Sequence, residues 1–469
     1  MHHSAKVAEL CTVDIGCKRD DNLSDSLTVL PAFGLASINT TALQKPTVGF
    51  RDSKENTYPM KRFTALSLLA ALTVVAALAT TALAQDALPR LIVPESSIEH
   101  PGDAGVRMHT NFVYLENHNP TTLGSTWETP ASIACVYKLV KQIAGCPIAT
   151  ASKLPTGGSK AIALVDAYDN PDASTNLATF SAQFGLPAAN FMQVYASGKK
   201  PANNPGGWSL EEALDIEWAH AMAPNAQIIL VEAASSSDAD LYAAETLAAN
   251  LVVAAGGGEV SNSWSGGEYS SEAADATTYF STPGVVYFAS TGDSAFALGF
   301  PAVASTVVAA GGTSLKRNAS TGDISSEAYW DNAYGGGGGG LSQFITRPTY
   351  QNGISGIVGS KRGVPDISSD ADPLSGVAMY DADKGNGFAG GWLQVGGTSV
   401  SSPSLAGIIN SAGSFASSST TELTELYNDY GNATTYKADF RDITKGNAKC
   451  TTGWDICTGI GAPITYVGK

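Results

Sequence analysis

The sequence predicts an α/β fold in which a parallel sheet is covered by helices on both faces. From about Lys160, short apolar runs alternate with longer amphipathic stretches, which is typical of strands and helices that succeed one another. The runs are apolar throughout, as in strands that are buried on both faces. We predict strands at 161–165, 228–231, 285–289 and 307–310, and helices at 210–222 and 239–253.

Polar clusters follow several of the predicted strands. Asp166 follows the first strand, residues 261–264 follow a Glu-Val pair, and Asp293 stands in a Thr-Gly-Asp turn after the third strand. Ligands bind beyond the carboxyl ends of the strands in such sheets, so we expect the functional site there. The Gly run 335–340 and residues 348–359 are predicted to be surface loops.

Composition indicates a globular, acidic protein. The chain has 469 residues, of which 43% are hydrophobic, and a formal net charge of −16. That content is enough for a substantial core, and a surface this acidic repels phosphate, so nucleic acid is excluded as a partner. Residues 1–84 carry eight Lys or Arg and seven Asp or Glu, so the acidity belongs to the remainder. Because basic groups are few, positive charges repel one another little once the carboxylates are protonated, which suits a protein that works at low pH.

An export signal begins at Met60. Lys61 and Arg62 precede an uncharged run, residues 63–84, that ends in Ala-Leu-Ala, the pattern of a cleaved signal peptide. A membrane anchor is the alternative because the run is long enough to span a bilayer, but its many Ala and Thr residues favour the signal. We therefore predict a signal peptide at 60–84 and a secreted or periplasmic protein that keeps no stable membrane association after cleavage. Residues 1–59 are interpreted as an upstream extension from a start codon assigned too early.

Four cysteines remain after residue 84, at positions 135, 146, 450 and 457. An even number in an exported protein indicates disulfides. Proximity favours Cys135 with Cys146 and Cys450 with Cys457, although four cysteines allow three pairings. A zinc site is the weaker interpretation, since no His lies near either pair.

A candidate nucleophile lies in one of two Gly-Gly-Thr-Ser segments, 311–314 and 396–399. A charged turn follows Ser314, whereas small and apolar residues follow Ser399 and predict a helix that enters the core, with Pro403 in its first turn. A Ser on a tight turn at a helix N-terminus is exposed and lies in the positive end of the helix dipole, which favours nucleophilic attack. The alternative is a Ser-rich helix cap without chemistry.

The general base is predicted to be a carboxylate. His100, His109 and His118 precede residue 129 and lie outside the strand and helix region, whereas His220 lies on the predicted helix at 210–222. At about 100° per residue, Glu211 and Asp215 are about 400° apart and share a face, whereas His220 lies about 900° from Glu211, on the opposite side.

Like charges one turn apart raise one another's pKa, which suits proton exchange in acid. A solvated acidic face is the alternative interpretation of Glu211 and Asp215. Glu212 ends a Ser-x-x-Glu segment that begins at Ser209, so it is predicted to form a capping box and to be structural.

Residues 211–224 resemble the E-x-x-x-D helix of the sedolisins, also called serine-carboxyl peptidases. The joint occurrence of further family segments in the same order is much more specific than any one of them. The resemblance runs from about Thr129 to the C-terminus and implies a subtilisin-like fold. The further segments are 260–264, 290–294, 299–302, 364–366 and 397–403.

The resemblance also implies a mechanism. Ser399 would attack the scissile carbonyl, Glu211 would act as general base and acid, Asp215 would orient Glu211, and Asp293 would complete the oxyanion hole. An ionised carboxylate would repel the developing oxyanion, so Asp293 has to be protonated. We therefore expect a monomeric acid-acting endopeptidase whose partners are polypeptide substrates.

One structural calcium site is implied near the C-terminus. Its ligands would be the side chains of Asp442 and Asp455 and the main-chain carbonyls of Ile443, Thr451 and Gly453, a set of oxygens that suits a hard cation. The alternative is an ordinary turn rich in Asp and Gly.

The sequence departs from the family in three places. Gly396 stands where Ser is common, Thr451 stands where Gly is common, and residues 85–128 form only a short segment between the signal and the catalytic domain, predicted at 129–469. Autoinhibition by a folded prodomain is therefore not expected.

Other functions remain as alternatives. They are a Ser-His-Asp enzyme, which the phase of His220 disfavours, and a GDSL-type esterase, whose motif is expected nearer the start of a domain than residues 292–294. A tripeptidyl-exopeptidase of the same family and a non-catalytic binding protein on a decayed peptidase fold are the remaining two.

Overall fold

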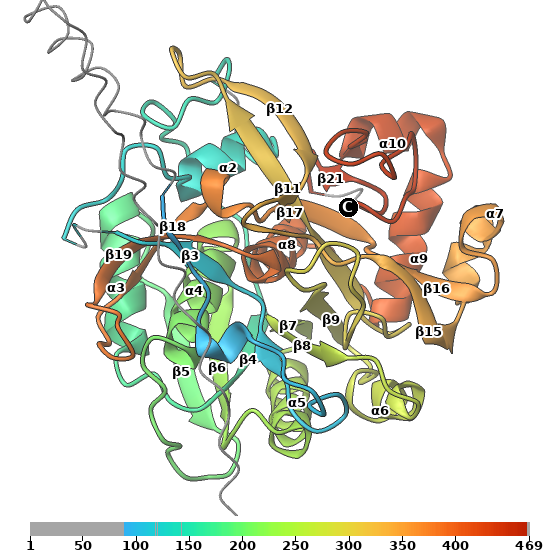
Figure 1. The fold of residues 1–469 in the computed structure, drawn as a ribbon, viewed down its shortest axis with the longest axis horizontal. Coiled ribbons are helices and arrows are strands. Elements are labelled where there is room, and N and C mark those ends of the chain that lie inside the picture. The colour runs from blue at the N-terminus through green and yellow to red at the C-terminus, as the bar shows by residue number, and fades with distance from the viewer. Residues whose placement is uncertain (1–88, 118, 120, 142, 467–469) are drawn as a thin grey trace, which may run out of the picture. The chain divides into compact units, whose positions relative to one another are not determined.

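The computed structural model describes residues 89–117, 119, 121–141 and 143–466 (Figure 1). The predicted upstream extension (1–59) and signal peptide (60–84) lie outside these residues, as does His118. The residues that are described belong to one compact unit. None of their helices has the length and apolar character that crossing a membrane requires.

A central sheet of eight strands organises the fold, in the order β12-β11-β9-β7-β4-β6-β5, with β17 also paired to β11. All of its pairings are parallel except that of β11 with β12. The predicted parallel sheet is thus confirmed. The strands are β4 (Ala161–Ala167), β5 (Asn190–Tyr195), β6 (Gln227–Ala233), β7 (Gly258–Asn262), β9 (Val285–Ser290), β11 (Val308–Arg317), β12 (Ile324–Tyr329) and β17 (Ile367–Asp370).

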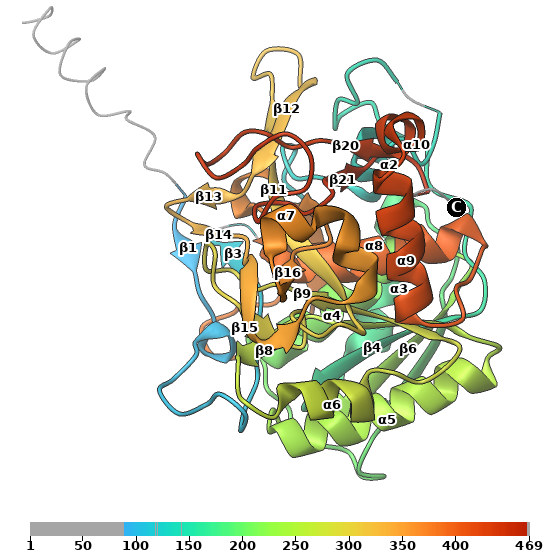
Figure 2. The ribbon, with the colours of Figure 1, turned by 90° about the vertical axis from the view of Figure 1, so that its right-hand side faces the viewer.

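Helices cover both faces of this sheet (Figure 2). Side chains alternate across a strand, so Ile162 and Leu164 of β4 join one core while Ala163 and Val165 join another. The first core contains residues of α3, α4, α8 and α9, and the second contains residues of α5 and α6. These helices are α3 (Ala173–Phe184), α4 (Trp208–Met222), α5 (Asp238–Ala254), α6 (Glu272–Tyr279), α8 (Thr398–Ala412) and α9 (Ser419–Tyr430).

The segment before residue 129 is built into the domain. Its strand β3 lies between β1 and β19 in a four-stranded antiparallel sheet that ends with β18, and its strand β2 pairs with β8, which also pairs with β10. His109 therefore lies in a sheet and not outside the strand and helix region. The strands are β1 (Leu91–Ile92), β2 (His109–Thr110), β3 (Val113–Leu115), β8 (Trp264–Gly267), β10 (Gly299–Phe300), β18 (Val377–Asp381) and β19 (Gly391–Gly396).

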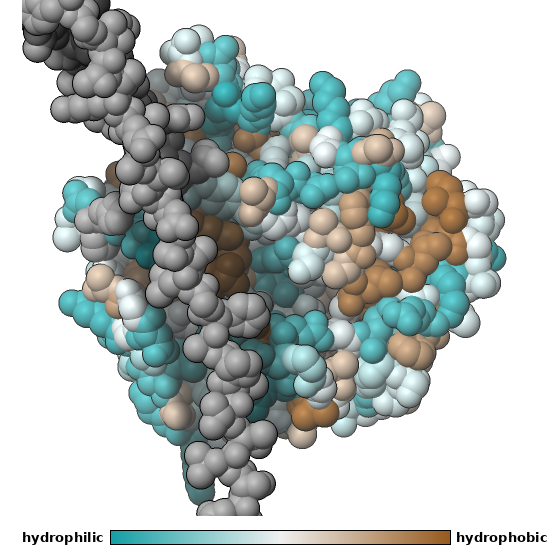
Figure 3. Space-filling view, in the orientation of Figure 1, coloured by the Kyte–Doolittle hydropathy of each residue, from teal (hydrophilic) through white to brown (hydrophobic). Residues whose placement is uncertain are grey.

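The remaining elements lie outside the central sheet. An apolar patch lies over β15 and α7 (Figure 3), where Leu341, Phe344 and Ile357 are exposed. The predicted loop at 348–359 contains η2 and α7. The elements are η1 (Glu95–Ser97), α2 (Pro130–Val136), β13 (Asp331–Asn332), β14 (Gly335–Gly336), β15 (Gly340–Thr346), η2 (Thr349–Ile354), α7 (Ser355–Val358), β16 (Lys361–Val364), η3 (Pro373–Ser375), α10 (Ala433–Asp439), β20 (Phe440–Arg441) and β21 (Ala462–Pro463).

The Gly run at 335–340 is not the surface loop that the sequence predicts, because residues 336–339 are buried. A Cβ atom on Gly338 would collide with the carbonyl oxygen of Thr291, in the turn that follows β9. The run lacks side chains so that its backbone can pack against that turn.

The favoured disulfide pairing is confirmed. Cys135 is bonded to Cys146 and Cys450 to Cys457. The first bridge links the end of α2 to the loop that follows it, and the second closes a loop near the C-terminus.

Gly338→Ala should destabilise the fold by about 1–3 kcal/mol, because the added methyl group overlaps the main chain at Thr291. Gly353→Ala is the matched control, since nothing lies within 4 Å of its added Cβ, and it should change stability by less than about 0.5 kcal/mol. Thermal unfolding of the two variants measures the difference. Equal melting temperatures would contradict the packing role of the Gly run.

Candidate active site

Ser399 lies in the first turn of α8, two residues after Gly397. Gly397 precedes the helix with a φ of 105°, a conformation that favours glycine. The Ser399 hydroxyl oxygen lies 2.9 Å from Glu211 Oε2 and 3.1 Å from the carbonyl oxygen of Ser263. The serine that the sequence favours therefore meets a carboxyl group, at the edge where the sheet's carboxyl ends lie.

Pro403 lies one turn deeper in α8 than predicted, because the helix already begins at Thr398. Proline has no N–H, so the carbonyl of Ser399 receives no helical hydrogen bond from position 403. The Ser263 hydroxyl lies 3.4 Å from this carbonyl oxygen instead.

Glu211 and Asp215 lie on one side of α4, toward α8 and β7. Asp215 Oδ1 accepts a hydrogen bond of 2.7 Å from the Ser263 hydroxyl, which follows β7. Both carboxyl groups are fully buried. His220, further along α4, directs its Nε2 to the carbonyl oxygen of Pro187 at 3.0 Å.

Burial raises the pKa of both carboxyl groups well above their ordinary values, since the charged form loses hydration. The charges of Asp215 and Asp166 raise the pKa of Glu211 further, and Asp166 does the same to Asp215. The sequence indicated Asp166 only as a polar residue after a strand. The fold turns it into the third carboxyl group of a cluster that has to retain protons.

Asp293 lies in the turn after β9 and faces the start of α8. Its Oδ1 accepts hydrogen bonds from the Thr398 amide (2.7 Å) and the Thr398 hydroxyl (2.9 Å). Its Oδ2 is buried and has no hydrogen-bond partner among the described residues. Burial raises the pKa of Asp293 to about 7, against the opposing effect of the two bonds from Thr398. In acid, the free oxygen can therefore carry a proton and donate it.

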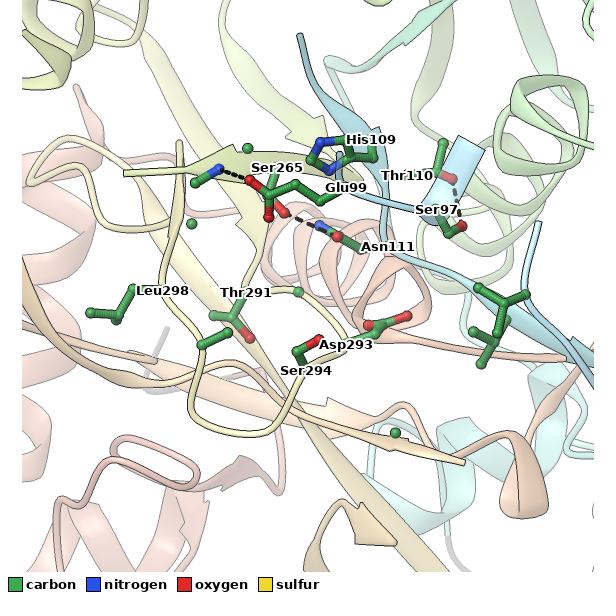
Figure 4. A pocket seen from close by; sticks show the side chains of 18 of the residues that line it. Ser97, Glu99, His109, Thr110, Asn111, Ser265, Thr291, Asp293, Ser294 and Leu298 are labelled. Carbon is green, nitrogen blue, oxygen red and sulfur yellow. Dashed lines mark hydrogen bonds between the residues drawn. The ribbon is translucent and has the colours of Figure 1, made fainter. Parts of the chain in front are cut away.

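A cavity of about 380 Å³ lies over this part of the site (Figure 4). Asp293, Thr291 and Ser294 line it from the turn after β9, and Ser265 lines it from β8. Asn111 lies among them, contributed by the segment that precedes residue 129.

Comparisons with known proteins find relatives of one kind. Kumamolisin from Bacillus sp. (strain MN-32) is 30% identical over 347 residues, which cover 66% of this chain and 59% of that protein. Sedolisin from Pseudomonas sp. (strain 101) is 30% identical over 182 residues, 36% of this chain and 29% of that protein. Tripeptidyl-peptidase 1 from Dictyostelium discoideum is 28% identical over 350 residues, 66% of this chain and 53% of that protein.

The solved structure of Pseudomonas sedolisin in complex with two molecules of pseudo-iodotyrostatin covers 72% of this chain and 95% of its own, with a TM-score of 0.58 and 22% identity. The chain is similar to peptidases of the sedolisin family. No family model matches it. The match spans at most 59% of the length of any of the three relatives.

Similarity to kumamolisin and sedolisin confirms the resemblance found in the sequence, and the solved structure confirms the subtilisin-like fold. The motif segments that carried the resemblance are scattered over nearly 200 residues of the sedolisin-like region. In the structure, the segments with Glu211, Ser263, Asp293 and Ser399 meet at one edge of the sheet.

Glu212 does not form the predicted capping box. Helix α4 begins at Trp208 after Gly207, so Ser209 lies inside the first turn and its hydroxyl has no partner in the described part of the chain. The Glu212 carboxyl group is fully buried and equally unpartnered there. Burial, followed by the charges of Glu232 and Asp166, raises its pKa well above the ordinary value.

The loop for which the sequence predicts calcium offers oxygen donors from Asp442, Asp455 and the main chain. Asp442 Oδ2 accepts the Gly453 N–H at 3.0 Å, and Asp455 Oδ2 accepts the Thr451 N–H at 2.6 Å, so the loop backbone is tied to both carboxyl groups. The carbonyls of Ile443, Thr451 and Gly453 accept no hydrogen bond from the described residues. Among all residues that the structure describes, no group of three His, Cys, Asp or Glu side chains could hold a metal ion. Two carboxylates with main-chain carbonyls nevertheless fit a hard cation.

The buried carboxyl groups should make the fold less stable as pH rises. Burial raises the pKa of Glu232 from 4.5 to about 8, so its contribution to stability is present below pH 4.5 and is lost as pH rises through about 8. The melting temperature should therefore fall between pH 4.5 and 8. Glu232→Gln should reduce this fall, because its amide stays uncharged.

The exposed carboxyl group of Glu425 provides the control for that measurement. Glu425→Gln makes the same change at an exposed position and should reduce the fall in melting temperature by less than Glu232→Gln does. A wild-type fall that Glu232→Gln does not reduce would contradict the assignment of this pH dependence to Glu232.

Proposed function

We propose that this protein is an acid-acting serine-type endopeptidase that hydrolyses polypeptides with Ser399 as nucleophile, Glu211 as general base and acid, Asp215 as its partner and Asp293 in the oxyanion hole. The observation that carries the proposal is the 2.9 Å contact between the Ser399 hydroxyl and Glu211 Oε2. A serine hydroxyl needs a base within hydrogen-bond reach, and Glu211 fills that position. Kinship with kumamolisin and sedolisin supports the same chemistry.

In the proposed reaction, Glu211 takes the Ser399 proton while the serine oxygen attacks the carbonyl carbon of the substrate. The Ser399 N–H and the protonated Asp293 stabilise the oxyanion that forms. Glu211 then gives its proton to the leaving amine, and a water molecule hydrolyses the ester with Glu211 again as base. The negative charge of Asp215 disfavours a second negative charge on Glu211. The two carboxyl groups therefore favour a state in which they share one proton.

The environment of Asp293 supports action in acid. Oδ1 is already occupied by two donors from Thr398, so only a protonated Oδ2 can stabilise an oxyanion. The pKa of about 7 means that this proton is present in acid and is lost above neutral pH.

The decisive test is digestion of a denatured protein between pH 3 and pH 8. Ser399→Ala and Glu211→Gln should each lower the rate by at least about a thousandfold. Ser314→Ala is the matched control, because Ser314 ends the other Gly-Gly-Thr-Ser segment and its hydroxyl bonds to Asp372. This variant and His220→Ala should retain activity. Equal digestion by wild type and Ser399→Ala would refute the proposal.

Asp293 makes a sharper pH test. Asp293→Ala should lose about 10²–10³ in kcat, the usual cost of a missing oxyanion donor. Asp293→Asn should retain more activity, because an amide Nδ2 can donate without a titrating proton. Its rate should no longer decline near pH 7. An unchanged decline in Asp293→Asn would show that another group sets the alkaline limit.

We also propose secretion, with a signal peptide at 60–84 and a sedolisin-type catalytic domain at 129–469, whose sheets include strands from the described residues before 129. Two disulfides support an oxidising compartment, since such bonds persist outside the cytosol.

We propose further that the loop containing Asp442 and Asp455 binds one structural calcium ion, with the carbonyls of Ile443, Thr451 and Gly453. The ion would hold this loop in place and neutralise the two carboxylates. Calcium at about 100 times its Kd should add about 2.7 kcal/mol to stability, so chelation should lower the melting temperature and added calcium should restore it. Asp442→Asn should abolish this response. A wild-type melting temperature that is indifferent to calcium would contradict the site.

A further inference from the structure

The segment before β3 crosses the candidate active site in an extended conformation. Strand β2 pairs antiparallel with β8, with His109 opposite Ser265 and Thr110 opposite Trp264. The pairing continues in one more bond, in which the Asn111 N–H donates to the carbonyl oxygen of Ser263 at 3.0 Å. The chain therefore lies along β8 as an added strand, the manner in which many peptides bind to a sheet edge.

The carbonyl of Asn111 occupies the position where an oxyanion would form. Its oxygen accepts the Ser399 N–H at 3.0 Å. A Cβ atom added to Gly397 would collide with this same oxygen and would lie 2.6 Å from Asp293 Oδ2. The Asn111 carbonyl is thus flanked by the two groups that we assign to the oxyanion hole, beside the hydroxyl that we assign as nucleophile.

The Asn111 side chain fills a polar recess of matching chemistry (Figure 4). Its Nδ2 donates to Ser290 Oγ at 2.7 Å, and its Oδ1 accepts from Ser265 Oγ at 3.0 Å. Ser290 is fully buried and Asn111 is only 6% exposed. An aliphatic side chain here would leave both serine hydroxyls unpaired, whereas a carboxamide satisfies both, so the recess discriminates between them.

The chain continues in a bound form beyond Asn111. The carbonyl of Phe112 accepts a hydrogen bond of 2.8 Å from the Ser97 hydroxyl, and Val113 pairs with Gly396 of β19. A polypeptide is therefore held on both sides of the bond next to Ser399, which is how an endopeptidase binds a substrate. Ser399 is fully buried beneath it.

From these contacts we infer that residues 108–113 lie in the groove as a substrate does, with the Asn111–Phe112 bond at Ser399, and that Ser265 and Ser290 select asparagine before the cleaved bond. The inference rests on the proposed function. The Asn111–Phe112 bond is then a substrate of the chain's own active site. Another substrate can reach Ser399 only after the segment that ends at Asn111 has been released.

The reaction balances without any further reagent than water. Ser399 Oγ forms an ester with the Asn111 carbonyl carbon, and the bond from that carbon to the Phe112 nitrogen breaks. The serine proton passes through Glu211 to that nitrogen, which becomes a new amino terminus. Water then hydrolyses the ester, leaving a carboxylate on Asn111 and restoring Ser399.

The first test is incubation of the full chain at pH 4, followed by intact mass measurement and N-terminal sequencing. Wild type should acquire an N-terminus at Phe112, whereas Ser399→Ala should stay uncut at this bond. Cutting of Ser399→Ala there, or a wild type that is never cut there, would overturn the inference.

Digestion of denatured casein by the same samples separates this inference from the proposed function. Casein digestion without the Phe112 terminus would overturn only the inference. Absence of both activities would overturn both proposals.

The second test addresses selectivity with two peptides, Met-His-Thr-Asn-Phe-Val and its counterpart with Leu in place of Asn. The first reproduces residues 108–113. Wild type should prefer the Asn peptide at least about tenfold in kcat/KM, and Ser290→Ala should reduce this preference toward one. No preference in wild type, or the same preference in Ser290→Ala, would overturn the assignment of the recess.

Discussion

The contact between the Ser399 hydroxyl and the buried carboxyl group of Glu211 is the interaction on which the rest of the site depends. A carboxyl group without water around it favours its neutral form, and here Asp215 and Asp166 add further negative charge nearby. The fold therefore holds several groups that retain protons in the native state. A subtilisin-like sheet built around such a cluster suits chemistry in acid. There, one of these protons can be exchanged without leaving several ionised carboxylates in the interior.

Glycine residues let main-chain segments approach one another closely around Ser399. The turn at Gly397 brings the Ser399 N–H, the Asp293 carboxyl group and the Asn111 carbonyl to one point, which a side chain at Gly397 would block. The Gly run around Gly338 has a related role, because it packs against Thr291 in the loop that carries Asp293. Glycine at these places positions the donors that we propose for the oxyanion hole and does not serve flexibility.

The segment that precedes residue 129 changes how the domain is understood. It contributes strands to two sheets and covers Ser399, so it is part of the folded domain. By our inference, it also lies where a substrate would lie. The groove between β8 and β19 accepts a chain that continues in both directions. This geometry supports our proposal of an endopeptidase, which needs no substrate N-terminus near the cleaved bond.

The sequence by itself determined the features that depend on local periodicity. The apolar runs marked the buried strands, the helical phase put Glu211 and Asp215 on one side of α4, and short separations favoured the two disulfides. The tertiary structure alone decided contacts between residues far apart in the chain. Asn111 meets Ser399 across 288 positions, Asp166 joins the carboxyl cluster, and Glu212 is buried and caps nothing. Periodicity indicates which face of an element is apolar, but it does not indicate which distant backbone lies against that face. At this site, that packing determines how deeply the carboxyl groups are buried and which charged groups lie near them.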